Sequence, residues 1–133
     1  MEKVAVYASF KNQNNKSIEY FLKQISDYCL LKNYDYTIYF DKIQSRLDLN
    51  RKELNNLKDD IKNKEYSKIV IKDITQLSKN TVHNIEFLQF VSDNDCKIEC
   101  IDGTDLTLYK RIFDRISKKK EEKVRWITKL KEK

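Results

Sequence analysis

The sequence predicts an α/β fold, a three-layer sandwich in which helices cover both faces of a mainly parallel sheet of four to five strands, followed by a long C-terminal helix. Two observations lead to this prediction. Short apolar runs alternate along the chain with segments whose apolar residues recur at helical spacing. The runs at 4–8 and 68–71 are also nearly continuous, as in parallel strands buried on both faces. Such alternation requires right-handed crossovers, which place helices on the sheet.

Four segments are expected to form the strands. Residues 4–8 and 68–71 have the composition of central strands. Residues 36–40 and 97–101 alternate more between apolar and polar side chains, which is typical of strands nearer a sheet edge. The sequence therefore predicts which of these strands are central.

Three helices are expected between these strands, each with one apolar face. The apolar residues that share a face are, helix by helix, Ile18, Leu22, Ile25 and Cys29; Leu54, Leu57 and Ile61; and Val82, Ile85, Leu88 and Val91. Ser17 is a candidate N-cap of the first helix, and Asn80 or Thr81 of the third. The polar segment 42–50 lacks periodicity and is predicted to be a mobile loop.

Composition excludes several classes of protein. A chain of 133 residues supports one domain with its own core. Charged residues make up 36% of the chain, and no run approaches the ~20 apolar residues that a membrane span needs. The N-terminus enters a strand directly and resembles no signal peptide, so a cytoplasmic location is expected.

Metal and cofactor sites are not predicted. The three cysteines, Cys29, Cys96 and Cys100, form no Cys-x-x-Cys pair, and the single histidine lies far from them in sequence. Buried, reduced thiols are the expectation. One glycine and no proline exclude the glycine-rich loops that bind nucleotide phosphates. We therefore expect neither a metal nor a cofactor.

Positive charge is concentrated at the C-terminal end of the chain. Residues 106–133 contain eleven Lys or Arg and four Asp or Glu, whereas residues 1–105 contain sixteen and seventeen. We accordingly divide the chain into an α/β domain at 1–105 and a basic amphipathic helix at 106–133. The helix begins with aromatic and apolar residues and then becomes lysine-rich, which suits a partner contact followed by a phosphate contact.

Two segments resemble the active-site motifs of the serine recombinases, the resolvase/invertase family. Residues 7–12 resemble the motif Tyr-Ala-Arg-Val-Ser-Thr, and residues 74–79 resemble Leu-Asp-Arg-Leu-Ser-Arg. Weaker similarities occur at 39–41 and at 51–54, where the family arginine is kept as Arg51. The resemblance covers roughly residues 3 to 105, and it departs from the family pattern at 44–46 and Asn33, where the family has Ser-Gly and Gly.

The resemblance implies a fold suited to DNA strand exchange from which most catalytic groups are missing. In the family a serine attacks a DNA phosphodiester, and arginines hold the scissile phosphate. Here Ser9 occupies the position of the first arginine and Lys11 that of the serine. Thr75, Gln76 and Lys79 replace the aspartate and two arginines. Lysine offers phosphate a point charge without the planar fork of arginine.

The leading hypothesis is therefore a resolvase-like domain without catalytic activity, which works by self-association and by binding DNA or an active recombinase partner. The candidate DNA contacts are Arg51, Lys79, Lys118, Lys119, Lys120, Lys123 and Arg125. The candidate residues for forming a homodimer or higher oligomer are Tyr109, Phe113 and Ile116. Arg51 could equally be an ordinary surface arginine.

Two alternatives remain. The first is an active, divergent recombinase in which Lys11 activates Ser9, on the expectation that both point to the same face of one strand. It requires a reacting oxygen displaced by ~6–7 Å. The second is an α/β interaction module whose basic helix binds an acidic protein or an anionic membrane surface. The single tryptophan, Trp126, and the interrupted apolar stripe argue against the membrane. The chain could also be a piece of a longer recombinase.

Overall fold

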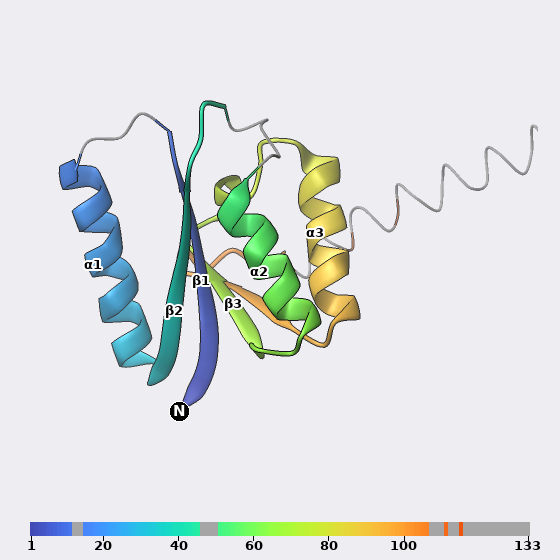
Figure 1. Cartoon of the computed structure of the whole chain (residues 1–133), viewed down its shortest axis with the longest axis horizontal. Helices are drawn as coiled ribbons and strands as arrows, with labels where there is room; N and C mark the ends of the chain where they lie inside the picture. The colour runs from blue at the N-terminus through green and yellow to red at the C-terminus, as the bar shows by residue number, and fades with distance from the viewer. Residues whose placement is uncertain (12–14, 46–50, 107–110, 112–114, 116–133) are drawn as a thin grey trace, which may run out of the picture.

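The computed structural model describes residues 1–11, 15–45, 51–106, 111 and 115. Strands and helices alternate along the chain, as the apolar periodicity predicts (Figure 1). The elements are β1 (Glu2–Phe10), α1 (Asn15–Leu31), β2 (Tyr34–Lys42), α2 (Lys52–Lys62), β3 (Lys68–Ile71), the short 3₁₀ helix η1 (Ile74–Gln76), α3 (Thr81–Asp93) and β4 (Lys97–Cys100).

The described strands form one parallel sheet in the order β2-β1-β3-β4. The two nearly continuous apolar runs, β1 and β3, lie in the centre, and the two alternating segments lie at the edges. This confirms the predicted assignment. The reason is that a central strand is covered on both faces, and every residue of β1 from Val4 to Phe10 is buried.

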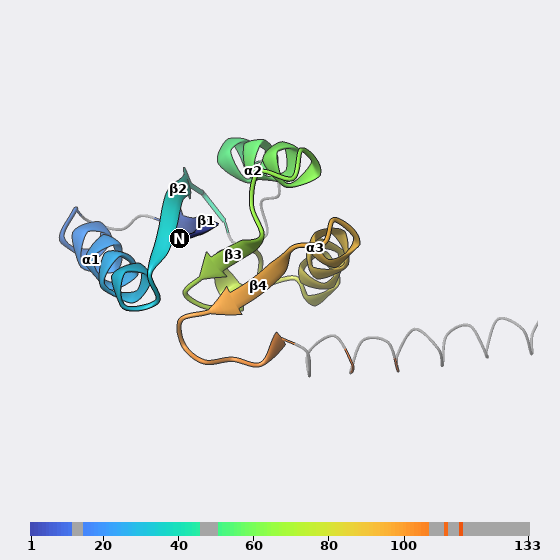
Figure 2. The same ribbon diagram turned by 90° about the horizontal axis from the view of Figure 1, so that it is seen from below.

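Helices cover both faces of the sheet (Figures 1 and 2). On one face, α1 packs Phe21, Ile25 and Cys29 against alternate residues of β1 such as Val4 and Val6. On the other face, α2 and α3 pack their buried residues against the remaining positions of β1 and β3. The three-layer α/β sandwich is confirmed, because the period of two along β1 sends its side chains alternately into two cores.

Two details of the helices differ from expectation. Ser17 is not an N-cap, because α1 already begins at Asn15. Val82 is 52% exposed and does not belong to the buried face of α3, which includes Phe87 instead. Asn80 is confirmed as the N-cap of α3, since its side-chain oxygen accepts hydrogen bonds from the backbone N–H groups of the first helical turn at 3.0 and 3.3 Å.

The segment predicted as a mobile loop is partly ordered. Strand β2 continues through Lys42, and Ile43 is buried, with its N–H donating to the carbonyl of Phe10 at 2.9 Å. The expectation of a loop at 42–50 is therefore wrong at its beginning, because the β1–β2 pairing extends further than the apolar pattern indicates. Residues 46–50 lie outside the described part of the chain.

Most of the predicted C-terminal helix lies outside the described part of the chain. Within 106–133 the structure describes Leu106, Arg111 and Arg115. The predicted oligomerisation and tail DNA contacts therefore lie outside the described residues. These are Tyr109, Phe113, Ile116, Lys118, Lys119, Lys120, Lys123 and Arg125.

The cysteines behave as predicted. All three are buried free thiols. Burial raises the pKa of Cys29 to about 11 and that of Cys100 to about 12, so these thiols are protonated and unreactive near neutral pH. The described residues include no group of histidine, cysteine and carboxylate side chains that could hold a metal ion, and no described helix has the length and apolar content to cross a bilayer.

Candidate functional site at the carboxyl edge of the sheet

Three of the predicted site residues, Ser9, Arg51 and Gln76, come together where the carboxyl ends of β1 and β3 lie side by side. After β1 the chain leaves to α1 on one face, and after β3 it leaves through η1 to α3 on the other face. In parallel α/β sheets, this reversal of direction opens a crevice beyond the strand ends in which ligands bind. The topology therefore places the end of β1 and the segment 72–76 at the usual location of a functional site.

Ser9 and Gln76 are joined by two hydrogen bonds across this crevice. The Ser9 N–H donates to Gln76 Oε1 at 2.9 Å, and Ser9 Oγ donates to the Gln76 carbonyl at 2.7 Å. Ser9 is 1% exposed and Gln76 is 7% exposed. The two residues that replace family arginines at these positions therefore bind each other.

Arg51 extends inward from the start of α2 and is 1% exposed. Its Nη1 donates to the Gln76 carbonyl at 2.6 Å and to the Tyr7 hydroxyl at 3.4 Å. A buried guanidinium is tolerated only where its N–H groups find hydrogen-bond acceptors. The Gln76 carbonyl and the Tyr7 hydroxyl are two such acceptors. Arg51 is therefore not an ordinary surface arginine.

Asp41 supplies the negative charge of this site. The Tyr7 hydroxyl, which accepts from Arg51, donates to Asp41 Oδ2 at 2.9 Å. The Asp41 carboxylate also accepts the N–H groups of Glu53 at 2.9 Å and Leu54 at 3.0 Å, in the first turn of α2. It thus stabilises the positive end of the helix dipole. We refer to Tyr7, Ser9, Asp41, Arg51 and Gln76 as the carboxyl-edge network.

The other three predicted catalytic positions lie outside this network. Lys11, Thr75 and Lys79 are exposed. The Thr75 N–H and hydroxyl both donate to Asp73 Oδ1, the N–H at 2.9 Å, which caps η1. The expectation that Ser9 and Lys11 share a strand face is wrong, because β1 ends at Phe10 and Lys11 lies beyond it.

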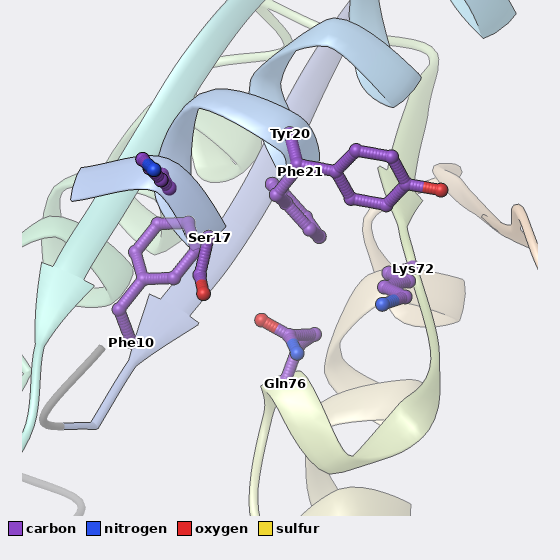
Figure 3. A pocket seen from close by; sticks show the side chains of 7 residues that line it. Phe10, Ser17, Tyr20, Phe21, Lys72 and Gln76 are labelled. Atoms are coloured by element: carbon purple, nitrogen blue, oxygen red, sulfur yellow. The ribbon is translucent and has the colours of Figure 1, made fainter. Parts of the chain in front are cut away.

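A pocket of about 440 Å³ lies beside the network, between α1 and η1 (Figure 3). Its lining residues are Phe10, Lys16, Ser17, Tyr20, Phe21, Lys72 and Gln76. Of the predicted site residues, Gln76 belongs to this lining.

Sequence reasoning missed Lys16 and Lys72 as site residues. A signal was available for Lys72, which directly follows β3 and therefore lies at the same edge of the sheet as the end of β1. The sequence gives no signal for the part of Tyr7 in linking Asp41 to Arg51, because this depends on contacts with residues 34 and 44 positions away.

The carboxyl-edge network predicts that the domain loses stability at alkaline pH. Burial raises the pKa of Tyr7 above its ordinary value of 10.0, with Asp41 acting in the same direction and Arg51 in the opposite one. Neutral Tyr7 therefore contributes stability below pH 10.0 that is lost as the pH rises above it, because the unfolded chain then releases the proton first.

Replacing Tyr7→Phe should lower the free energy of unfolding at pH 7 by about 1–3 kcal/mol, because Asp41 and Arg51 lose a hydrogen-bonding partner. The difference in unfolding free energy between the variant and the wild type should narrow above about pH 10, since only the wild type loses stability through the Tyr7 hydroxyl. Urea denaturation at several pH values checks this. Tyr20→Phe, at a tyrosine that is 65% exposed, is the matched control. A difference that stays constant with pH would contradict the assignment.

Comparison with known proteins identifies the family. The model of the resolvase N-terminal domain matches residues 6–118. No curated protein sequence matches this chain.

Solved structures share the fold. The N-terminal catalytic domain of TP901-1 integrase aligns with a TM-score of 0.75 and 18% identity over 91% of this chain and 98% of that chain. A resolvase family site-specific recombinase from Streptococcus pneumoniae has a TM-score of 0.67 and 18% identity over 96% and 93% of the two chains. The C-terminal catalytic domain of ISC1926 TnpA, an IS607-like serine recombinase, has a TM-score of 0.66 and 19% identity over 98% and 99%. From the family match and the shared fold, we conclude that this chain belongs to the resolvase N-terminal domain family and is a resolvase-type recombinase domain associated with DNA recombination.

Proposed function

We propose that this domain acts in DNA recombination without cutting DNA, by associating with itself and by binding DNA or an active recombinase partner. One observation carries the proposal. Ser9, the hydroxyl nearest in sequence to the nucleophile position at Lys11, is 1% exposed and donates its proton to the Gln76 carbonyl at 2.7 Å. A nucleophile must reach the phosphorus in line, and this hydroxyl is buried and engaged.

The groups that would stabilise the transition state support the same proposal. Phosphoryl transfer needs positive donors directed at the developing charge. Gln76 supplies a neutral amide where the family has an arginine, and Arg51 donates inward to the Gln76 carbonyl. Lys79 is exposed at the same edge and offers a single charge. We retain the exposed Lys79 as a candidate DNA contact on the strength of the family resemblance. Arg51, which is 1% exposed, would contact DNA only if the network around it rearranged.

The proposal predicts that the purified protein forms no covalent adduct with supercoiled plasmid DNA and does not nick it. Denaturing gels of labelled DNA measure the adduct, and agarose gels measure nicking. An adduct would favour the active, divergent recombinase. If it disappears in Ser9→Ala, with the fold checked by circular dichroism, then Ser9 is the nucleophile. If it persists, another side chain attacks. Either result overturns the proposal.

DNA binding is expected to depend on the C-terminal lysines. Replacing Lys118, Lys119 and Lys120 by glutamine should weaken binding to all sequences about equally. It should also reduce the slope of log affinity against log salt by about 0.9 for each phosphate that the variant no longer neutralises. Fluorescence anisotropy at several salt concentrations measures both quantities.

The matched control removes the same charge from the α/β domain. Lys23, Lys52 and Lys97 are exposed, and their joint replacement by glutamine should leave the salt slope nearly unchanged. An equal decrease of affinity in both triple variants would indicate a non-specific effect of net charge. Unchanged affinity in both would place the DNA-binding surface elsewhere.

Self-association is expected to depend on the apolar beginning of the same C-terminal segment. Phe113→Asp and Ile116→Asp should convert oligomers into monomers in sedimentation velocity, because a charge in an apolar interface loses its hydration. Leu31→Asp, at a residue that is 83% exposed on α1, makes the same chemical change and should leave the oligomer intact. An oligomer that survives both C-terminal substitutions would rule out pairing through this segment.

A further inference from the structure

We propose that the pocket between α1 and η1 binds a small phosphomonoester that carries an aromatic group, such as a nucleoside monophosphate. This ligand differs from the DNA backbone contacts proposed above, and the pocket is formed by other residues. Its volume of about 440 Å³ falls in the range of small-molecule sites, about 300–1,000 Å³. It lies at the β1/β3 reversal point, where parallel α/β folds bind ligands.

The Gln76 side chain presents a hydrogen-bond donor to the pocket. It is 7% exposed, and its Oε1 is held by the Ser9 N–H at 2.9 Å. This bond fixes the orientation of the amide and leaves Nε2 as a donor for which no described residue provides an acceptor. Figure 3 shows the Gln76 amide between Ser17 and Lys72, with its oxygen on the side of Ser17. An acceptor on a bound ligand would therefore gain a hydrogen bond from this amide nitrogen.

The polar lining of the pocket favours an anion. Lys16 comes from α1 and Lys72 from the segment after β3, so the two charges are contributed by different walls. Among the described residues, the lining includes no carboxylate. The Lys72 Nζ lies 5.9 Å from the centre of the Phe21 ring, which holds the charge over the pocket (Figure 3). The positive end of the α1 dipole lies at the same wall as Lys16, since α1 begins at Asn15.

The number of charges favours a phosphomonoester over a DNA phosphodiester. A monoester carries about −1.5 to −2 charges at neutral pH and presents three terminal oxygens. It therefore matches two ammonium groups and the additional donor at Gln76. A diester in the DNA backbone carries one negative charge and has oxygen substituents on both sides, which fit a concave pocket less well.

Aromatic side chains account for the organic part of the ligand. Phe10 and Phe21 meet edge to face, with ring centres 5.3 Å apart, and form an apolar wall. Tyr20 lies at the pocket with 65% of its surface exposed. An exposed aromatic ring beside a phosphate site offers a stacking surface for a base. The combination of donors and rings therefore points to a nucleotide and not to a free inorganic anion.

Calorimetric titration of the full chain with adenosine monophosphate tests this inference. We expect saturable binding that Lys16→Gln and Lys72→Gln each weaken by at least about tenfold, the effect of about 1.4 kcal/mol. Gln76→Glu should abolish binding, because it replaces the donor by a negative charge of the same shape. Lys23→Gln, an exposed lysine of the same helix, should have no effect. Circular dichroism confirms that each variant is folded.

Three probes establish the ligand class. Adenosine, which lacks the phosphate, should not bind measurably, and inorganic phosphate should bind more weakly than the nucleotide. A duplex oligonucleotide without terminal phosphates should not displace the nucleotide. Undetectable nucleotide binding, equal binding in Lys16→Gln and Lys72→Gln, equal binding of adenosine, or displacement by the duplex would each overturn the inference. A DNA-cutting activity would overturn the proposed function but leave this titration unchanged.

Discussion

The Gln76 carbonyl is the acceptor on which the whole carboxyl edge of the sheet depends. It accepts from Ser9 Oγ at 2.7 Å and from Arg51 Nη1 at 2.6 Å, and so joins β1, the start of α2 and η1. A guanidinium that is 1% exposed cannot be left without acceptors, because an uncompensated buried charge costs several kcal/mol. The two hydrogen bonds to this carbonyl therefore help to hold η1 against β1 and the start of α2.

The same requirement supports the proposal that the domain does not cut DNA. An arginine directed at a ligand keeps its fork open toward solvent, whereas Arg51 directs Nη1 to a backbone carbonyl and to Tyr7. Asp41 lies on the far side of Tyr7, so opposite charges are linked through one hydroxyl. This arrangement is rigid, because moving any one group leaves another without its hydrogen bond.

Positive charge is distributed unevenly along the chain. Residues 1–105 contain one more acidic than basic residue, and residues 106–133 contain seven more basic than acidic ones. Within the described domain, the exposed lysines Lys16 and Lys72 nonetheless meet at one pocket. The two proposed interactions, attraction of polyanions by residues 106–133 and recognition of a small anion at the pocket, therefore involve different residues.

The sequence by itself determined the alternation of strands and helices, the central place of β1 and β3, the Asn80 cap and the reduced state of the cysteines. These follow from local periodicity and from side-chain chemistry within a few residues. Only the tertiary structure decided that Arg51 is buried, that Val82 is exposed and that Gln76 belongs to both the network and the pocket. Burial of these residues depends on segments tens of positions away in sequence. A polar residue next to a strand has the same local pattern whether its partner is water or another side chain.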